Sequence, residues 1–137
     1  ETLDLRIRRQ SENSLKIGSF LEKRVPRILH PGLASHPQHA LAMQQMAACG
    51  SIFSFEVEGR TQAHALLDAL ELIDISNNIG DSRSLMTHPA STTHSGVAEE
   101  KRIEMGISEG MLRFNVGLED ADDLIEDLDR ALEKAGL

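Results

Sequence analysis

The apolar positions along the chain follow two periods, one typical of helices and the other of strands. Segments in which apolar residues recur every three or four positions predict helices, at residues 1–23, 37–48, 61–73, 97–105 and 120–135. Alternation is clearest at 51–58, where Phe53, Phe55 and Val57 share one face of a predicted strand. Further strands are predicted at 83–87 and 111–116, with a short extended piece at 27–30.

This succession of helices and short strands, joined by brief connections, predicts an α+β fold of two layers. We expect a small, mainly antiparallel sheet with helices packed on one face, in one domain over residues 1–137. Because the first residues already have a helical pattern, we also expect the chain to be a piece of a larger protein. The apolar stripe that should turn its first helix toward the core consists of Leu3, Ile7, Ser14, Ile17 and Leu21.

Charge and composition exclude several classes of function. The formal net charge is −8 and the basic residues are dispersed, so no binding to nucleic acid or to an anionic membrane is expected. No apolar run reaches membrane-spanning length, and no secretory signal pattern is present. A single cysteine, Cys49, indicates a reducing compartment, the cytoplasm, and its apolar neighbours favour a small buried side chain over a nucleophile.

Histidines and acidic residues are more typical of structural roles here than of metal sites. His36 and His39 have a zinc-like spacing, but no third ligand is near them in sequence, which favours surface or capping roles. His88 and His94 flank a run of small polar residues, which they are predicted to hold by hydrogen bonds instead of acting as bases. The acidic cluster Asp120, Asp122 and Asp123 lies where a helix dipole favours anions, which favours helix capping over metal binding.

One arginine stands out within the predicted strand 111–116. Leu112, Phe114 and Val116 are expected to face the core, which turns Arg113 to the opposite face of the sheet. Its planar guanidinium matches a carboxylate through two parallel hydrogen bonds. That carboxylate belongs either to an internal Asp or Glu or to a bound ligand, and the residue pattern leaves both interpretations open.

Two motifs resemble a known enzyme family. The first is Gly-Asp-Ser-Arg-Ser-Leu-Met-Thr-His-Pro-Ala-Ser-Thr-Thr-His at 80–94, and the second is Leu-Arg-Phe-Asn-Val-Gly-Leu-Glu-Asp at 112–120. Both resemble the enzymes of Cys/Met metabolism that use pyridoxal 5′-phosphate (PLP), the cystathionine γ-synthase family. The resemblance covers essentially the whole chain, and the motifs occur in the family's order. It implies the C-terminal, small domain of a fold-type-I PLP enzyme.

The same resemblance implies how function is divided between this domain and the rest of such an enzyme. An upstream domain would carry the Schiff-base lysine and most PLP contacts, so these 137 residues are expected to bind no PLP, to contain no catalytic residue and to be inactive alone. Arg113 matches the arginine that clamps the α-carboxylate of the amino-acid substrate. Asn78 matches a position, often Ser in the family, that helps to hold the same carboxylate.

The implied reaction of the parent enzyme is a γ-replacement in methionine biosynthesis. Sulfide would replace succinate in O-succinylhomoserine to give homocysteine, in a cytoplasmic homo-oligomer that is a tetramer in the family. Other family activities remain open, namely cystathionine γ-synthase, O-acetylhomoserine sulfhydrylase and γ-lyase. A non-catalytic module that captures small carboxylates through Arg113 is a further alternative from a different functional class.

Overall fold

The computed structural model describes all residues, 1–137, and contains five α-helices, one short 3-10 helix and five strands. The helices are α1 (Leu3–Leu21), α2 (His39–Gln45), α3 (Arg60–Ala69), α4 (Glu99–Glu104) and α5 (Ala121–Lys134), with the 3-10 helix η1 at Pro89–Ser91. The strands are β1 (Arg27–Leu29), β2 (Ile52–Glu56), β3 (Asp74–Ile75), β4 (Leu85–Thr87) and β5 (Met111–Asn115). No helix is both long enough and apolar enough to cross a membrane.

The strands form one open sheet in the order β1-β2-β5-β4-β3. All neighbours are antiparallel except β3 and β4, which are parallel. The predicted α+β fold with a mainly antiparallel sheet is therefore confirmed. Strand β3 was not predicted, because its two residues are too few to show an alternation.

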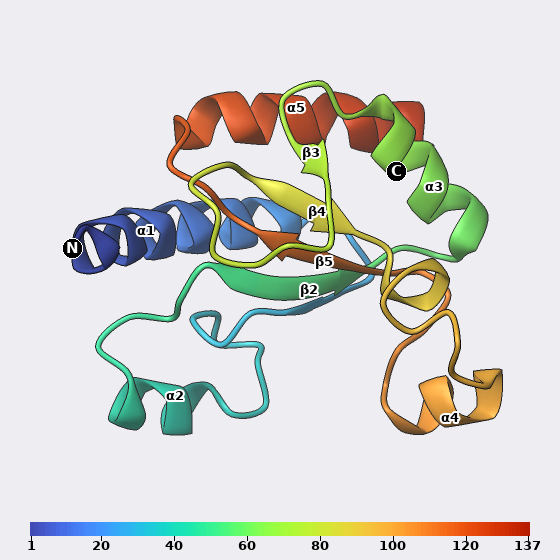
Figure 1. The fold of residues 1–137 in the computed structure, drawn as a ribbon, viewed down its shortest axis with the longest axis horizontal. Coiled ribbons are helices and arrows are strands. Elements are labelled where there is room, and N and C mark those ends of the chain that lie inside the picture. The colour runs from blue at the N-terminus through green and yellow to red at the C-terminus, as the bar shows by residue number, and fades with distance from the viewer.

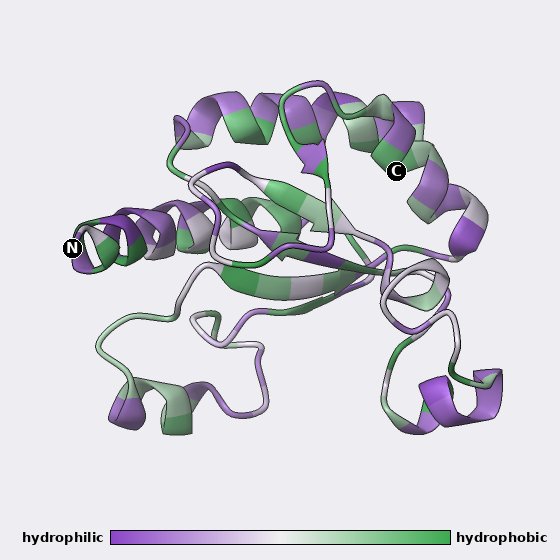
Figure 2. Ribbon diagram, in the orientation of Figure 1, coloured by the Kyte–Doolittle hydropathy of each residue, from purple (hydrophilic) through white to green (hydrophobic).

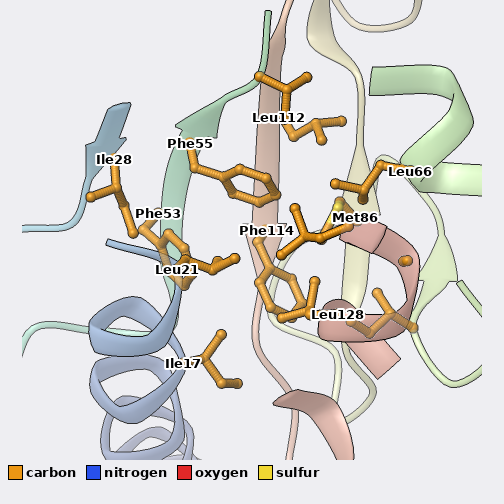
Figure 3. Packing of buried hydrophobic residues seen from close by; sticks show 14 of the residues in the cluster. Ile17, Leu21, Ile28, Phe53, Phe55, Leu66, Met86, Leu112, Phe114 and Leu128 are labelled. Atoms are coloured by element: carbon orange, nitrogen blue, oxygen red, sulfur yellow. The ribbon is translucent and has the colours of Figure 1, made fainter. Parts of the chain in front are cut away.

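Helices α1, α3 and α5 cover one face of the sheet, as predicted (Figure 1). The register places Phe53 opposite Phe114 and Phe55 opposite Leu112, so strands β2 and β5 turn their apolar residues to the same side. In Figure 3 these side chains meet Leu66 of α3, with further core residues from α1 and α5. Figure 2 shows the contrast with the peripheral α4, which is almost wholly hydrophilic.

The opposite face of the sheet is covered in part by the loop 76–84, which joins β3 to β4 (Figure 1). Contacts from this loop to β5 help to bury polar residues on that face, including Thr87 and Asn115 at 1% exposure each. A polar but solvent-excluded surface of this kind is where a ligand group can be bound by fixed donors.

The first helix departs from its predicted pattern. Leu3 and Ile7 are 65% and 36% exposed, so the predicted stripe is wrong in the first two turns. Those turns extend beyond the sheet and meet no core (Figure 1). Further along, the polar residues Gln10 and Asn13 are buried, because they donate to the backbone carbonyls of Val116 and Glu119, both at 2.9 Å.

Two acidic residues, one at the N-cap of α5 and one within it, accept hydrogen bonds from backbone N–H groups at helix ends. Asp120 is the N-cap and accepts a hydrogen bond from the Asp122 backbone at 2.8 Å, which confirms the predicted capping role. Buried Asp127 accepts from the backbone N–H groups of three successive residues, 71–73, at 2.9–3.0 Å. The predicted helix 61–73 accordingly ends at Ala69, and this turn brings Ile73 into the core.

Candidate functional site

The two motifs of the sequence meet in space. Glu119 accepts hydrogen bonds from both the backbone N–H and the hydroxyl of Ser84, at 2.7 and 2.9 Å. The Ser84 hydroxyl in turn accepts from the backbone N–H of Gly117 at 2.9 Å. A side chain at Gly117 would lie 2.5 Å from the Ser84 backbone, so only glycine allows this approach. The contacts give Ser84 a structural role and fix the start of β4 against the end of β5.

Arg113 occupies the middle of β5 and faces away from the helices, as predicted. It is half-buried, and its direct cross-strand neighbours are Ser54 of β2 and Thr87 of β4. Neither neighbour carries a charge, so the side chains on both sides of the guanidinium are polar but neutral.

The internal salt bridge that the sequence allowed for Arg113 is not formed. None of the ion pairs in the structure includes Arg113. The nearest acidic residue along β2, Glu56, pairs instead with Arg27 at 3.0 Å. Arg113 donates one hydrogen bond, from Nη2 to the backbone carbonyl of Asn77 at 2.8 Å. This single bond leaves one complete edge of the guanidinium fork without a hydrogen-bond partner in the chain.

Asn78 lies in the loop directly after the residue that contacts Arg113. Its backbone N–H donates to Ser76 Oγ at 3.2 Å, and the residue is exposed. Its side-chain amide makes no hydrogen bond within the chain and is the group left to meet a ligand. The structure thus brings the predicted pair, Arg113 and the Asn78 segment, to one place on the free face of the sheet.

Three neighbours of this place were not predicted as site residues. Thr87 Oγ1 donates to the side-chain carbonyl of Asn77, and Asn115 Oδ1 accepts from the backbone N–H of Gly80 at 3.3 Å. Asn115 Nδ2 is buried without a partner. The only sequence signal was the alternation of the strand, which already placed Asn115 on the same face as Arg113.

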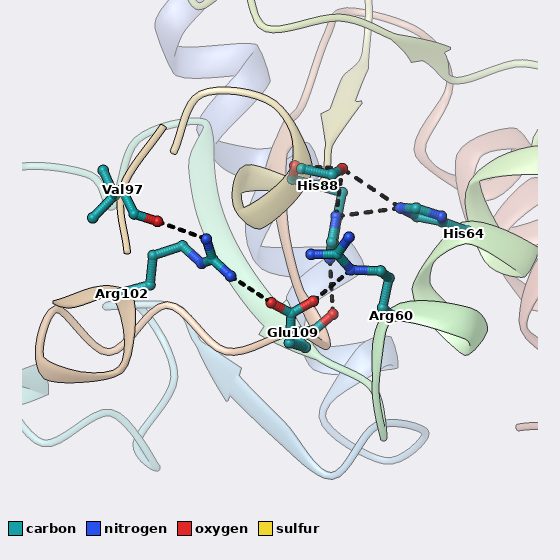
Figure 4. Close-up of polar contacts among 7 residues, drawn as sticks. Arg60, His64, His88, Val97, Arg102 and Glu109 are labelled. Atoms are coloured by element: carbon teal, nitrogen blue, oxygen red, sulfur yellow. Dashed lines mark hydrogen bonds and ion pairs between the residues drawn. The ribbon is translucent and has the colours of Figure 1, made fainter. Parts of the chain in front are cut away.

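A second polar cluster joins α3, η1 and the start of β5 (Figure 4). Glu109 accepts hydrogen bonds from Arg60 at 2.5 Å and from Arg102 at 2.8 Å. These two guanidinium groups lower the pKa of the Glu109 carboxyl to about 2, with the Arg60 hydrogen bond as the largest cause. The carboxylate therefore stays ionised, and both arginines have an acidic partner within the protein.

His88 belongs to the same cluster and uses both ring nitrogens. Nε2 lies 2.8 Å from the backbone carbonyl of Glu109, and Nδ1 lies 2.7 Å from Ser91 Oγ. Burial lowers the pKa of His88, so the ring is neutral at pH 7, donating to the carbonyl and accepting from the serine. These bonds tie η1 to the residue before β5, which confirms the predicted loop-holding role.

His36 and His39 also bind backbone groups. His36 Nδ1 accepts from the Gln38 N–H at 3.1 Å, and His39 Nδ1 lies 2.9 Å from the carbonyl of Pro31. The ring of His94 contacts only the adjacent Thr93 hydroxyl, at 2.8 Å, so the prediction that it holds the loop is wrong. Cys49 is half-buried, which makes it more accessible than predicted. No group of three His, Cys, Asp or Glu side chains has a metal-binding arrangement.

The lysines of the chain do not fit a PLP site. All four are exposed, on α1, on α4, at the end of α5 or in the turn after α1. Lys16 pairs with Asp122 at 2.7 Å and Lys101 pairs with Glu104 at 2.8 Å. A Schiff-base lysine needs a desolvated amine of lowered pKa, and the chain has no tyrosine to stack on a pyridine ring. The four lysines and the lack of tyrosine therefore do not fit the Schiff-base and ring-stacking roles.

Comparison with known proteins identifies the family. Residues 1–133 match the model of the Cys/Met metabolism PLP-dependent enzymes, and the chain therefore belongs to that family. It is 43% identical to an O-succinylhomoserine sulfhydrylase of Mycobacterium tuberculosis over 96% of the chain. It is also 43% identical to an L-methionine gamma-lyase of Treponema denticola over 98% of the chain.

A solved structure gives the same relationship in three dimensions. Cystathionine gamma synthase of Xanthomonas oryzae, in complex with aminoacrylate and cysteine, superimposes with a TM-score of 0.93 at 40% identity over 98% of this chain. The chain covers 36% of that structure and 34% of each of the two curated relatives, about a third of their length. The fold is that of the C-terminal part of fold-type-I PLP enzymes.

Proposed function

We propose that this chain is the small, C-terminal domain of a PLP-dependent enzyme and that it binds the α-carboxylate of the amino-acid substrate through Arg113. The observation that carries the proposal is an arginine held in the middle of a strand with no acidic partner and with one edge of its guanidinium free. Leaving a half-buried cation without a counter-charge is unfavourable, and an anionic ligand provides that charge.

The proposed contribution of Arg113 to the reaction is orientation. Two parallel charge-assisted hydrogen bonds fix the plane of the carboxylate and, with it, the directions of the other bonds at the substrate's Cα. Restricting a reactant in this way converts binding energy into a lower barrier. Asn78 would add a side-chain donor to the same carboxylate from the loop 76–84. PLP and the groups that hold it would come from polypeptide outside these residues.

Among the activities of the family, we propose the formation of homocysteine from O-succinylhomoserine and sulfide by a cytoplasmic homo-oligomer, a tetramer as in the family. Two lines support this choice. The chain as a whole resembles the enzymes with that activity, and a relative at 43% identity has that name. A methionine lyase at the same 43% identity supports a second candidate, γ-elimination. The two activities differ in whether a nucleophile replaces the leaving group or the substrate is broken down to an α-keto acid.

An assay of the full-length, PLP-loaded enzyme separates these candidates. We expect sulfide-dependent homocysteine formation from O-succinylhomoserine, with lower kcat/KM for O-acetylhomoserine, for cysteine in place of sulfide, and for methionine. Rapid release of an α-keto acid from methionine, without homocysteine formation, would instead establish the lyase. Light scattering of the same preparation gives the oligomeric state, for which we expect a tetramer.

A further inference from the structure

We infer that Thr87 and Asn77 are positioning residues that hold the guanidinium of Arg113 in the orientation that receives a carboxylate. This inference rests on the proposed function of Arg113 and extends it to residues that do not themselves touch the substrate. The observation behind it is a continuous set of contacts from β4 through the loop 76–84 to Arg113 on β5.

Thr87 is the fixed end of this set of contacts. It is 1% exposed and lies directly across from Arg113 in the sheet, so its position is set by the strand pairing. Its hydroxyl donates to the side-chain carbonyl of Asn77 and lies 3.0 Å from the hydroxyl of Thr92. Thr92 Oγ1 also lies 2.8 Å from the backbone carbonyl of His88, and its single proton goes either to that carbonyl or to Thr87. The hydroxyl of Thr87 is therefore positioned by the strand pairing and lies against Thr92, the residue after η1.

Asn77 connects Thr87 to Arg113 through two hydrogen bonds. The residue belongs to an irregular loop and is exposed, so its backbone would be free to move without a tether. The bond from Thr87 holds its side chain, and its backbone carbonyl accepts from Arg113 Nη2 at 2.8 Å. A carbonyl partner orients the guanidinium without neutralising it, which an Asp or Glu at this place would do.

Preorganisation of this kind affects binding of the carboxylate more than the bond-breaking steps. An arginine that must be ordered on each binding event loses side-chain entropy that a pre-ordered arginine has already lost on folding. The arrangement therefore predicts an effect on KM for the amino-acid substrate that depends on the presence of Arg113.

The test is a double-mutant cycle in the full-length, PLP-loaded enzyme. We expect Thr87→Val to raise KM for O-succinylhomoserine about three- to tenfold, the usual cost of one lost hydrogen bond, with kcat within about twofold. Thr87→Ser keeps the hydroxyl and should restore the KM. Asn77→Ala, a change at an exposed side chain that leaves the core intact, should reproduce the effect of Thr87→Val. Thr93→Val is the matched control, because Thr93 lies in the same motif, 80–94, but makes no hydrogen bond with Thr87, Asn77 or Arg113.

The decisive comparison is made in an Arg113→Ala background, where Thr87→Val should have no further effect on KM. Amide exchange of residues 76–84 in the substrate-free enzyme should rise in Thr87→Val and Asn77→Ala. Equal effects of Thr87→Val with and without Arg113, or no effect of either variant on KM, would overturn this inference and leave the proposed function intact. An Arg113→Ala enzyme with unchanged KM would instead remove the proposed function itself.

Discussion

Two groups of arginines, a pair and a single residue, have different electrostatic settings. Arg60 and Arg102 share the carboxylate of Glu109, just before β5 begins. Arg113, within β5, has a backbone carbonyl as its partner and no carboxylate. The first group shares a carboxylate inside the protein, whereas Arg113 has no acidic partner in the chain. The presence of an arginine therefore says little about function until its counter-charge has been located.

The sheet explains the difference. On the face that carries Arg113, the adjacent cross-strand positions are Ser54 and Thr87, both short and neutral. Glu109 lies outside the strand, where α3 and α4 bring the other two arginines to it. The strand pairing thus keeps acidic residues away from Arg113.

The largest expected effect comes from removing Arg113 in the full-length enzyme. Arg113→Ala should raise KM for O-succinylhomoserine by about a hundredfold or more, because two charge-assisted hydrogen bonds are lost. Arg113→Lys keeps the charge without the planar fork, and its KM should be intermediate. The PLP absorbance band should persist in both variants. Loss of that band together with an unchanged KM would contradict the proposed role.

A smaller effect is expected when Arg113 is given the internal partner that it lacks. Ser54→Asp places a carboxylate directly across from Arg113, and the resulting ion pair must be broken before substrate binds. We expect KM to rise about ten- to fiftyfold. Ser54→Asn has the same shape without the charge and should change KM by less than about threefold. If the two variants behaved alike, steric interference would be the cause and charge would not.

The converse change at the other arginine group should affect stability and not substrate binding. Glu109→Gln removes the only carboxylate of Arg60 and Arg102, so we expect the melting temperature to fall by about 2–4 °C with KM unchanged. Asp4→Asn breaks an exposed ion pair with Arg8 and serves as the control, with a shift below about 1 °C. A rise of KM in Glu109→Gln comparable to that of Ser54→Asp would remove the distinction between the two groups.

The smallest effect is a pH dependence of stability that comes from buried histidines. Burial lowers the pKa of His30 and of His88, so the folded protein binds fewer protons than the unfolded chain just below pH 6.5. The contribution of these two histidines to the free energy of unfolding should therefore be complete above about pH 6.5. The free energy of unfolding should decrease as the pH drops toward about 5. Glu109, with its pKa of about 2, stays charged throughout this range.

Denaturant unfolding at several pH values measures this dependence. The decrease between pH 7 and 5 should be smaller in His88→Gln than in the wild type. It should be unchanged in His94→Gln, whose ring contacts only the adjacent Thr93 hydroxyl. Equal slopes in the wild type and in His88→Gln would show that the burial of His88 does not affect protonation.

Features that follow from local periodicity were predictable from the sequence. Alternation in 111–116 correctly placed Arg113 on the face opposite to Leu112 and Phe114, and the recurrence of apolar residues in 61–73 and 120–135 predicted α3 and α5. Contacts between distant segments were not predictable, because residues such as Thr87 and Asn77 belong to no repeating pattern. The absence of a carboxylate beside Arg113 likewise depends on strand register, which tertiary packing sets.

Ligand binding with and without a carboxylate tests the central claim most directly. L-norvaline and n-butylamine differ only by that group, and their inhibition constants can be measured on the full-length enzyme and on its Arg113→Ala variant. We predict that the variant loses about a hundredfold or more in affinity for norvaline and less than about threefold for butylamine. An equal loss for both ligands would contradict the assignment of Arg113 to the carboxylate.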